Sequence, residues 1–309
     1  MSLIRFFSML LLIWLVQCLL ILLAVAFFTL FERKVIGLFH LRTGPNKVSI
    51  LGLLQPLLDA FKLLTKQSLT PFRSNKFIYN LAPIMSLFLS LYVWLTLPLI
   101  FLMASLNYSL VMFFCVSSVI VFCVLLSGWS SNSKYSLIGC LRSVAQSISY
   151  EAVFSTLIIF LIVLIFSYSI NSLSTQSSCL FLIFLPLWVI CTLAETHRAP
   201  FDFAESESEL VSGFNTEYSG AYFAFIFLSE YAILLLSSVL IVYIFFMWAL
   251  PLNPFSLIFI RLLVRFLFIW IRVTYCRFRY DKLIIMSWKI LLPFVLMLFI
   301  RFIPIFLTL

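Results

Sequence analysis

Charged residues are scarce in this 309-residue chain. Asp, Glu, Lys and Arg make up 10% of it, 64% is hydrophobic, and the mean hydropathy is +1.19. A soluble domain of this length could not bury so much apolar surface. Apolar runs of about 20 residues recur along the chain, and each can cross a ~30 Å hydrocarbon layer as a helix. The runs are continuous rather than alternating, so the sequence predicts an all-α integral membrane protein rather than a barrel.

The motifs of soluble enzymes are also missing. The sequence contains no Walker loop, no GxGxxG, no Cys-x-x-Cys pair and no recognisable arrangement of nucleophile, histidine and acid. The seven cysteines lie mostly in apolar runs, which is typical of small buried residues. The two histidines, His40 and His197, are far apart. We therefore predict no metal, nucleotide, flavin, haem or iron–sulfur site in this chain.

The apolar runs define about eight transmembrane helices within a single domain, residues 1–309. The predicted spans are Leu3–Phe31, Phe77–Met103, Leu110–Trp129, Val144–Tyr168, Cys179–Leu193, Glu217–Trp248, Phe255–Val273 and Leu283–Phe306. An even number of spans places both termini on the same side of the membrane.

A shorter segment, 51–66, has a different pattern. Gln55, Asp59, Lys62 and Lys66 follow one helical stripe between apolar residues. The pattern predicts an amphipathic helix lying along the membrane interface. An ordinary surface helix packed on the bundle would carry the same stripe.

Basic residues are concentrated on one side of this topology. Sixteen of the twenty lie in the segments 32–77, 128–142, 195–217 and 272–289. The positive-inside rule places this side in the cytoplasm or the mitochondrial matrix. The predicted loops on this side are about 32–77, 129–143, 194–217 and 273–283. Orientation therefore explains the net charge of +9 better than nucleic-acid binding does.

Carboxylates gather on the same side. Six of the eleven acidic residues lie within 194–218, namely Glu195, Asp202, Glu205, Glu207, Glu209 and Glu217. Glu151 and Glu230 lie inside predicted spans, where carboxylates are costly and usually mark proton or ion routes. A buried ion pair or a solvated helix end would explain any single acid. Eight acids converging between residues 151 and 230 favour a proton route, because burial can raise a Glu pKa toward neutrality.

The seventh predicted span carries Arg261, Arg265 and Arg272. At ~100° per residue the three lie within about 40° of one another, and Arg261 is about 16 Å deeper than Arg272. The stripe is compatible with contact to lipid phosphates or with the lining of a polar cavity or subunit joint.

Five segments, in order, resemble the subunit 1 family of respiratory NADH–ubiquinone oxidoreductase, complex I, of the mitochondrially encoded type. They are FERKVIGLFHLRTGPNKV (31–48), LLQPLLDAFKLLTK (53–66), SGWSSNSKYSLIGCLRSVAQSISYE (127–151), AETHRAPFDFAESESELVSGFNTEY (194–218) and FRYDKL (278–283). The abundance of Phe, 36 residues, fits synthesis inside a mitochondrion.

The resemblance implies a multi-pass subunit of the mitochondrial inner membrane that joins the membrane and peripheral arms of complex I, with both termini in the intermembrane space. It implies ubiquinone as the substrate, with FMN and iron–sulfur clusters held by partner subunits, and membrane lipids as further partners. The quinone tunnel would involve Arg33, Arg42, Asp59, Lys62, Phe214 and Arg272. The proton-coupling acids would be Glu151, Glu195, Asp202, Glu205, Glu207, Glu217 and Glu230.

This sequence departs from the family pattern at four positions. His197 stands where Asn is usual, Gln67 where Glu is usual, and Arg265 is an extra charge within its span. Cys276 stands where Pro is usual, which leaves the local loop geometry less constrained.

Two other classes of function share parts of this sequence pattern. A membrane subunit of a related hydrogenase would share much of the pattern, but the amphipathic segment and the complete 31–48 stretch favour the quinone enzyme. A free-standing proton-coupled carrier is disfavoured because the chain has no internal repeat and no pair of Gly/Pro-broken helices.

Overall fold

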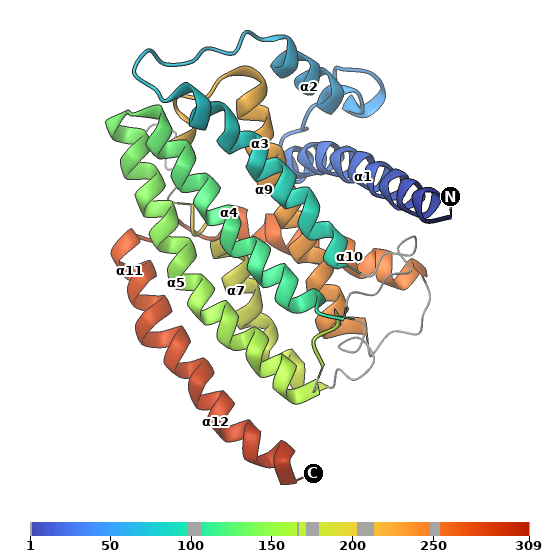
Figure 1. Cartoon of the computed structure of the whole chain (residues 1–309), viewed down its shortest axis with the longest axis vertical. Coiled ribbons are helices and arrows are strands. Elements are labelled where there is room, and N and C mark those ends of the chain that lie inside the picture. Colours follow the sequence, from blue (N-terminus) through green and yellow to red (C-terminus); the bar gives the residue numbers. More distant parts are fainter. Residues whose placement is uncertain are drawn as a thin grey trace.

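The computed structural model describes residues 2–97, 107–165, 167–170, 179–202, 213–247 and 254–308, and none of the residues in these ranges forms a strand. The chain is therefore all-α, as predicted (Figure 1). The α-helices are α1 (Ser2–Phe39), α2 (Gln55–Thr65), α3 (Lys76–Val93), α4 (Ser109–Ser131), α5 (Lys134–Ile165), α7 (Leu185–Glu195), α9 (Gly220–Ile241), α10 (Pro254–Thr274), α11 (Tyr280–Ile285) and α12 (Leu292–Thr308). Short 3-10 turns are η1 (Ile50–Gly52), η2 (Trp94–Thr96), η3 (Cys179–Phe184) and η4 (Gly213–Asn215), and π-helical turns are η5 (Val242–Phe246) and η7 (Met286–Leu291).

Within the described ranges, six helical segments are long and apolar enough to cross a membrane. They are Leu12–Phe39, Lys76–Thr96, Ser109–Ser130, Lys134–Val163, Gly220–Phe246 and Tyr280–Arg301. Each coincides with one of the predicted spans, which confirms a multi-pass helical membrane protein. The two other predicted spans correspond to a shorter apolar helix, Leu182–Glu195, and to α10, which has 21 residues but carries three arginines. For these two, membrane crossing stays a prediction.

Two helices continue well beyond the apolar runs that predicted them. Helix α1 extends to Phe39 rather than Phe31, and α5 begins at Lys134 rather than Val144. The predicted loop at 129–143 is therefore only a tight turn at Asn132 and Ser133. Hydropathy marks where a helix crosses lipid, whereas charged residues such as Lys, Arg and Glu are themselves good helix formers. Asn132 ends α4 in the left-handed conformation, with φ of 52°.

The helices pack side by side as a bundle. Helix α3 packs against α4 and α9, α4 packs against α5, and α5 contacts α7 and α12. Helix α1 lies against α9 and α10, and α2 contacts α1 and α9 at the end of the bundle where α4 turns into α5 (Figure 1). The core is rich in large side chains, and in its centre the ring of Trp188 packs edge to face against Phe245 and in a tilted arrangement against Phe154.

The predicted amphipathic segment forms α2. Pro56 lies in its first turn, where its missing N–H removes no helical hydrogen bond. Leu58, Phe61 and Leu64 of α2 are each at least half exposed, so the apolar face of α2 is not covered by this chain. This agrees with a helix lying along the membrane interface.

Small residues bring α4, α5 and η4 into close contact. A Cβ added at Gly128 of α4 would lie 2.3 Å from the Cβ of Cys140 of α5, and one at Gly139 would lie 2.8 Å from the Cα of Gly213. Backbones approach this closely only where small residues face each other. The contact fixes the start of η4 against α5, and thereby the connection that leads into α9.

We expect Gly128→Ala to destabilise the protein by about 1–3 kcal/mol, because the added methyl group must displace Cys140 or separate α4 from α5. The measurement is the temperature of heat-induced disassembly of the purified membrane complex. Ser118→Ala, on the exposed side of the same helix, is the matched control and should leave it unchanged. Equal disassembly temperatures for both variants would contradict the close-contact explanation.

Candidate functional site

A buried carboxylate lies at the centre of the charged end of the bundle. Glu32 of α1 has a side chain that is 6% exposed. Its Oε1 accepts hydrogen bonds from Arg272 at the end of α10 and from Arg198 Nη1 at 3.3 Å. Its Oε2 accepts a hydrogen bond from the Tyr231 hydroxyl of α9 at 2.8 Å. One carboxylate thus joins α1, α9, α10 and the segment that follows α7. We call these four residues the Glu32 cluster.

Arg198 is the most enclosed cation of the Glu32 cluster. Its guanidinium carbon lies 4.1 Å from the centre of the Tyr231 ring, a cation–π contact. Burial by itself would lower the pKa of Arg198, but the carboxylate of Glu32 and the neighbouring Tyr231 raise it above its ordinary value. Glu230 also attracts this guanidinium. Arg198 therefore stays charged, and it is held between acids on α1 and α9.

A second polar site adjoins the Glu32 cluster on α1. Arg33, the next residue, turns to the outer face and its Nη1 donates to Asp59 Oδ2 of α2 at 2.7 Å. Gln55 Nε2 donates to the other oxygen of Asp59 at 2.9 Å. Arg33 and Arg42 line a cavity of about 310 Å³ between the end of α1 and the turn through Pro45. We call this cavity the arginine pocket.

The predicted tunnel residues are divided between these places. Arg33, Arg42 and Asp59 lie at the arginine pocket or beside it, and Lys62 is exposed on the next turn of α2. Arg272 belongs to the Glu32 cluster. Phe214 is 2% exposed and lines a different cavity, with Glu195 and Glu230.

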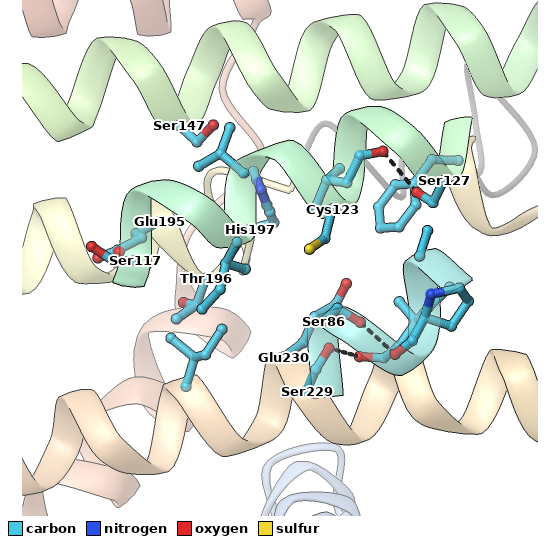
Figure 2. Close-up of a pocket in the computed structure, with 18 of the residues that line it drawn as sticks. Ser86, Ser117, Cys123, Ser127, Ser147, Glu195, Thr196, His197, Ser229 and Glu230 are labelled. Atoms are coloured by element: carbon cyan, nitrogen blue, oxygen red, sulfur yellow. Dashed lines mark hydrogen bonds between the residues drawn. The ribbon is translucent and has the colours of Figure 1, made fainter. Parts of the chain in front are cut away.

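This third site is a cavity of about 70 Å³ inside the bundle, enough for several water molecules (Figure 2). We call it the acidic cavity. Its polar side chains come from α3, α4, α5, α9, the last residue of α7 and the segment after it, and His197 lies near the middle of the view. They are Ser86, Ser117, Cys123, Ser127, Ser147, Glu195, Thr196, His197, Ser229 and Glu230.

The hydroxyl groups of the acidic cavity are oriented by the helices that carry them. Each serine donates to the carbonyl three residues earlier on its helix, at 2.7–2.9 Å. Thr196 donates to the carbonyl four residues earlier, that of Thr192, at 2.9 Å. With their protons engaged, these oxygens offer lone pairs to the cavity. Together with two carboxylates they suit water molecules and a migrating proton.

His197 is the basic group in the acidic cavity. Burial lowers its pKa to about 4, so the imidazole is neutral at neutral pH. Its Nδ1 is buried and has no hydrogen-bond partner among the described residues. The backbone φ of His197 is 50°, in the left-handed region where Asn and His are both over-represented. The departure from the usual Asn is therefore compatible with the local backbone.

The other predicted acids that the structure describes do not line the cavity. Glu151 lies one turn beyond Ser147 on α5 and interacts electrostatically with Glu195. Asp202 lies apart, paired with Arg277 at 3.3 Å. The backbone oxygen of Glu217 accepts the hydroxyl of Tyr79 at 2.6 Å, beside the stacked rings of Tyr79 and Tyr218. Glu205 and Glu207 lie outside the described residues, as does Glu209.

The loop that carries Cys276 is anchored by its neighbours. The N–H of Phe278 donates to the carbonyl of Pro200 at 3.1 Å, and the rings of Phe278 and Phe201 stack at 5.7 Å. Cys276 itself is exposed. The loop is therefore held by contacts with the segment after α7 rather than by the residue at position 276.

Sequence reasoning missed the centre of the site. Glu32 stands in the sequence among basic residues at a helix end, where a solvated acid is the ordinary interpretation, and Tyr231 looks like one more apolar residue of its span. Their contacts with each other, with Arg198 and with Arg272 join residues 33 to 240 positions apart. One weak signal was present, because an acid so close to an apolar run has little water available to it.

Comparison with known proteins places the chain in a family. The family model for NADH dehydrogenase matches residues 12–303. The NADH-ubiquinone oxidoreductase chain 1 of Aedes aegypti is 48% identical over 280 residues, 88% of each chain. Those of Heterololigo bleekeri and Xenopus laevis are 46% and 44% identical over 288 and 286 residues, covering 91% and 89% of this chain and 92% and 88% of theirs. The chain therefore belongs to the NADH dehydrogenase family, whose members include the chain 1 subunits of NADH–ubiquinone oxidoreductase.

Proposed function

We propose that this chain forms the access tunnel for ubiquinone in complex I and couples quinone reduction to proton translocation. The observation that carries the proposal is the segment Glu195–Arg198. Glu195 and His197 line the acidic cavity, while Arg198 binds Glu32, which is the residue next to Arg33 of the arginine pocket. A change of charge at the arginine pocket therefore reaches the carboxylates of the cavity through a short path, from Arg33 to the adjacent Glu32, and from Glu32 through Arg198 to Glu195.

The arginine pocket supplies the quinone side of this proposal. Guanidinium groups of Arg33 and Arg42 donate hydrogen bonds to the carbonyl oxygens of a quinone head group, and Asp59 holds Arg33 in position. Lys62 adds positive charge at the mouth. Phe214 and Arg272 belong to the inner part of the route in this proposal, since they lie at the acidic cavity and at the Glu32 cluster.

The acidic cavity supplies the proton side. Glu195 and Glu230 exchange protons with water in the cavity, and Glu151 responds to the charge of Glu195. Asp202, Glu205, Glu207 and Glu217 extend this acidic route toward the basic side of the membrane.

The location of the chain and its partners follow from the same assignment. The protein is placed in the mitochondrial inner membrane as one transmembrane domain, with the basic loops in the matrix and both termini in the intermembrane space, because 16 of 20 basic residues lie on one side of the predicted topology. FMN and iron–sulfur clusters belong to partner subunits of the peripheral arm, and the remaining contacts are with membrane-arm subunits and lipids.

Asp59→Asn is expected to lower quinone-dependent turnover about two- to fivefold, because it removes a half-exposed ion pair that orients Arg33. NADH oxidation with an artificial acceptor that takes electrons at the flavin should be unchanged. Asp281→Asn is the matched control, since Asp281 also pairs with an arginine, Arg279, at 3.2 Å but lies away from the pocket. Equal loss of both activities in assembled enzyme would count against a tunnel role.

Glu195→Gln keeps the size of the side chain and removes the titrating group from the acidic cavity. Quinone reductase activity and proton pumping should fall together by about tenfold or more, as for loss of a proton-transfer group. The complex should still assemble, as judged on a native gel. Glu230→Gln should have the same effect, and so should Glu205→Gln and Glu207→Gln. Normal turnover and normal proton stoichiometry in all four variants, singly and combined, would sink the coupling proposal.

Glu32→Gln leaves the largely buried Arg198 and the partly exposed Arg272 without their carboxylate. Removing one partner of a buried ion pair costs about 3–5 kcal/mol, so the variant should assemble poorly or disassemble at a lower temperature. Adding Arg272→Gln should restore part of the stability, because only Arg198 then remains unpaired. If the single and double variants are equally unstable, the two charges do not depend on each other.

A further inference from the structure

A large groove lies between α1, α9 and α10, away from the sites described above. It encloses about 570 Å³ and is lined by Leu12, Val16 and Leu20 of α1, by Tyr243 of η5, and by Arg261 and Arg265 of α10, among others. Tyr243 is near the end of the sixth predicted span; Arg261 is in the first half of α10 and Arg265 is at its middle. The groove therefore lies toward the end of the bundle opposite the Glu32 cluster.

The two arginines of this groove have only weak partners. Arg261 Nη2 donates to the Tyr243 hydroxyl at 3.4 Å, and Arg265 Nε donates to the Ser238 hydroxyl at 3.4 Å. Arg261 Nε is buried and lacks a hydrogen-bond partner in the part of the chain that the structure describes. Within that part neither guanidinium forms an ion pair with a carboxylate.

Two cations in this position need a negative charge. They are one helical turn apart on the same face of α10, so they repel each other. Charge within the membrane is costly unless it is paired or reaches the interface. The groove thus has the electrostatic requirement of an anion site, and this requirement is not met by the described residues.

The walls of the groove show what else the ligand must contain. Leu12, Val16 and Leu20 are 59%, 55% and 56% exposed and form a continuous apolar strip along α1, since they follow one another at four-residue spacing. Arg261 lies seven residues from the start of α10, about 10 Å along the axis, and a long Arg side chain can extend toward the head-group region. The ligand therefore combines an anionic group near the interface with an apolar chain.

We propose that this groove binds an anionic phospholipid. Its phosphate lies between the guanidinium groups of Arg261 and Arg265, and an acyl chain lies along Leu12, Val16 and Leu20. The inference requires that the chain spans the membrane, and it is independent of the proposed quinone and proton roles. A neutral quinone lacks the charge that the two arginines require.

The test is the phospholipid content of the intact purified complex after extensive detergent washing. The double variant Arg261→Gln/Arg265→Gln should lose one tightly bound anionic phospholipid per complex, as counted by mass spectrometry of extracted lipids. Arg301→Gln is the matched control, because Arg301 is an exposed arginine of α12 that does not line the groove. The same lipid content in the double variant and the parent would overturn the proposal.

A second measurement covers the case in which the double variant does not assemble. Phosphatidylglycerol added to the delipidated parent complex should raise its disassembly temperature, with about tenfold weaker apparent binding in Arg261→Gln alone. An equal effect of phosphatidylcholine, or of inorganic phosphate, would contradict a site that requires both the negative charge and the acyl chain. Cross-linking from a cysteine introduced at Val16 to a polypeptide instead of lipid would show that another subunit fills the groove, and would equally overturn it.

Discussion

The arrangement of the charged end of this protein depends on the carboxylate of Glu32. Two arginines from distant parts of the chain and one tyrosine hydroxyl converge on it. Each of these groups would be costly to bury alone, because an unpaired charge or polar group in a low-dielectric interior loses its hydration without compensation. The carboxylate thereby fixes the position of the segment after α7 relative to α1, α9 and α10.

Because of this ion pair, neighbouring residues of the chain lie in two different environments. Adjacent residues of a helix are ~100° apart, so Glu32 faces the bundle interior while Arg33 faces α2 and the arginine pocket. The same alternation occurs at the other side of the ion pair, where His197 faces the acidic cavity and Arg198 faces Glu32. The sites are therefore connected through short pieces of rigid backbone as well as through charge.

The fold and part of the site could be predicted from single-sequence patterns. Hydropathy located the membrane helices, and the stripe through Gln55 and Asp59 predicted α2, because both depend on local periodicity. The predicted end of α1 and the predicted start of α5 were wrong, since charged residues can continue a helix beyond the membrane. The partners of Glu32 could not be predicted, because the sequence around residue 32 contains no signal for a contact with Arg272, which is 240 positions away. The acidic stretch was found as a cluster, but its division between the cavity and Arg277 depends on tertiary packing.

The bonding of the cavity hydroxyls to their own helices has a consequence for what can occupy that space. A free hydroxyl can rotate to solvate either sign of charge, whereas these have committed their hydrogens to backbone carbonyls. An anion such as chloride or hydroxide would meet lone pairs and carboxylates around it and find few donors. Water molecules would instead direct their hydrogens toward the wall. The hydroxyl lining therefore biases the cavity toward positive charge before any carboxylate changes its protonation state.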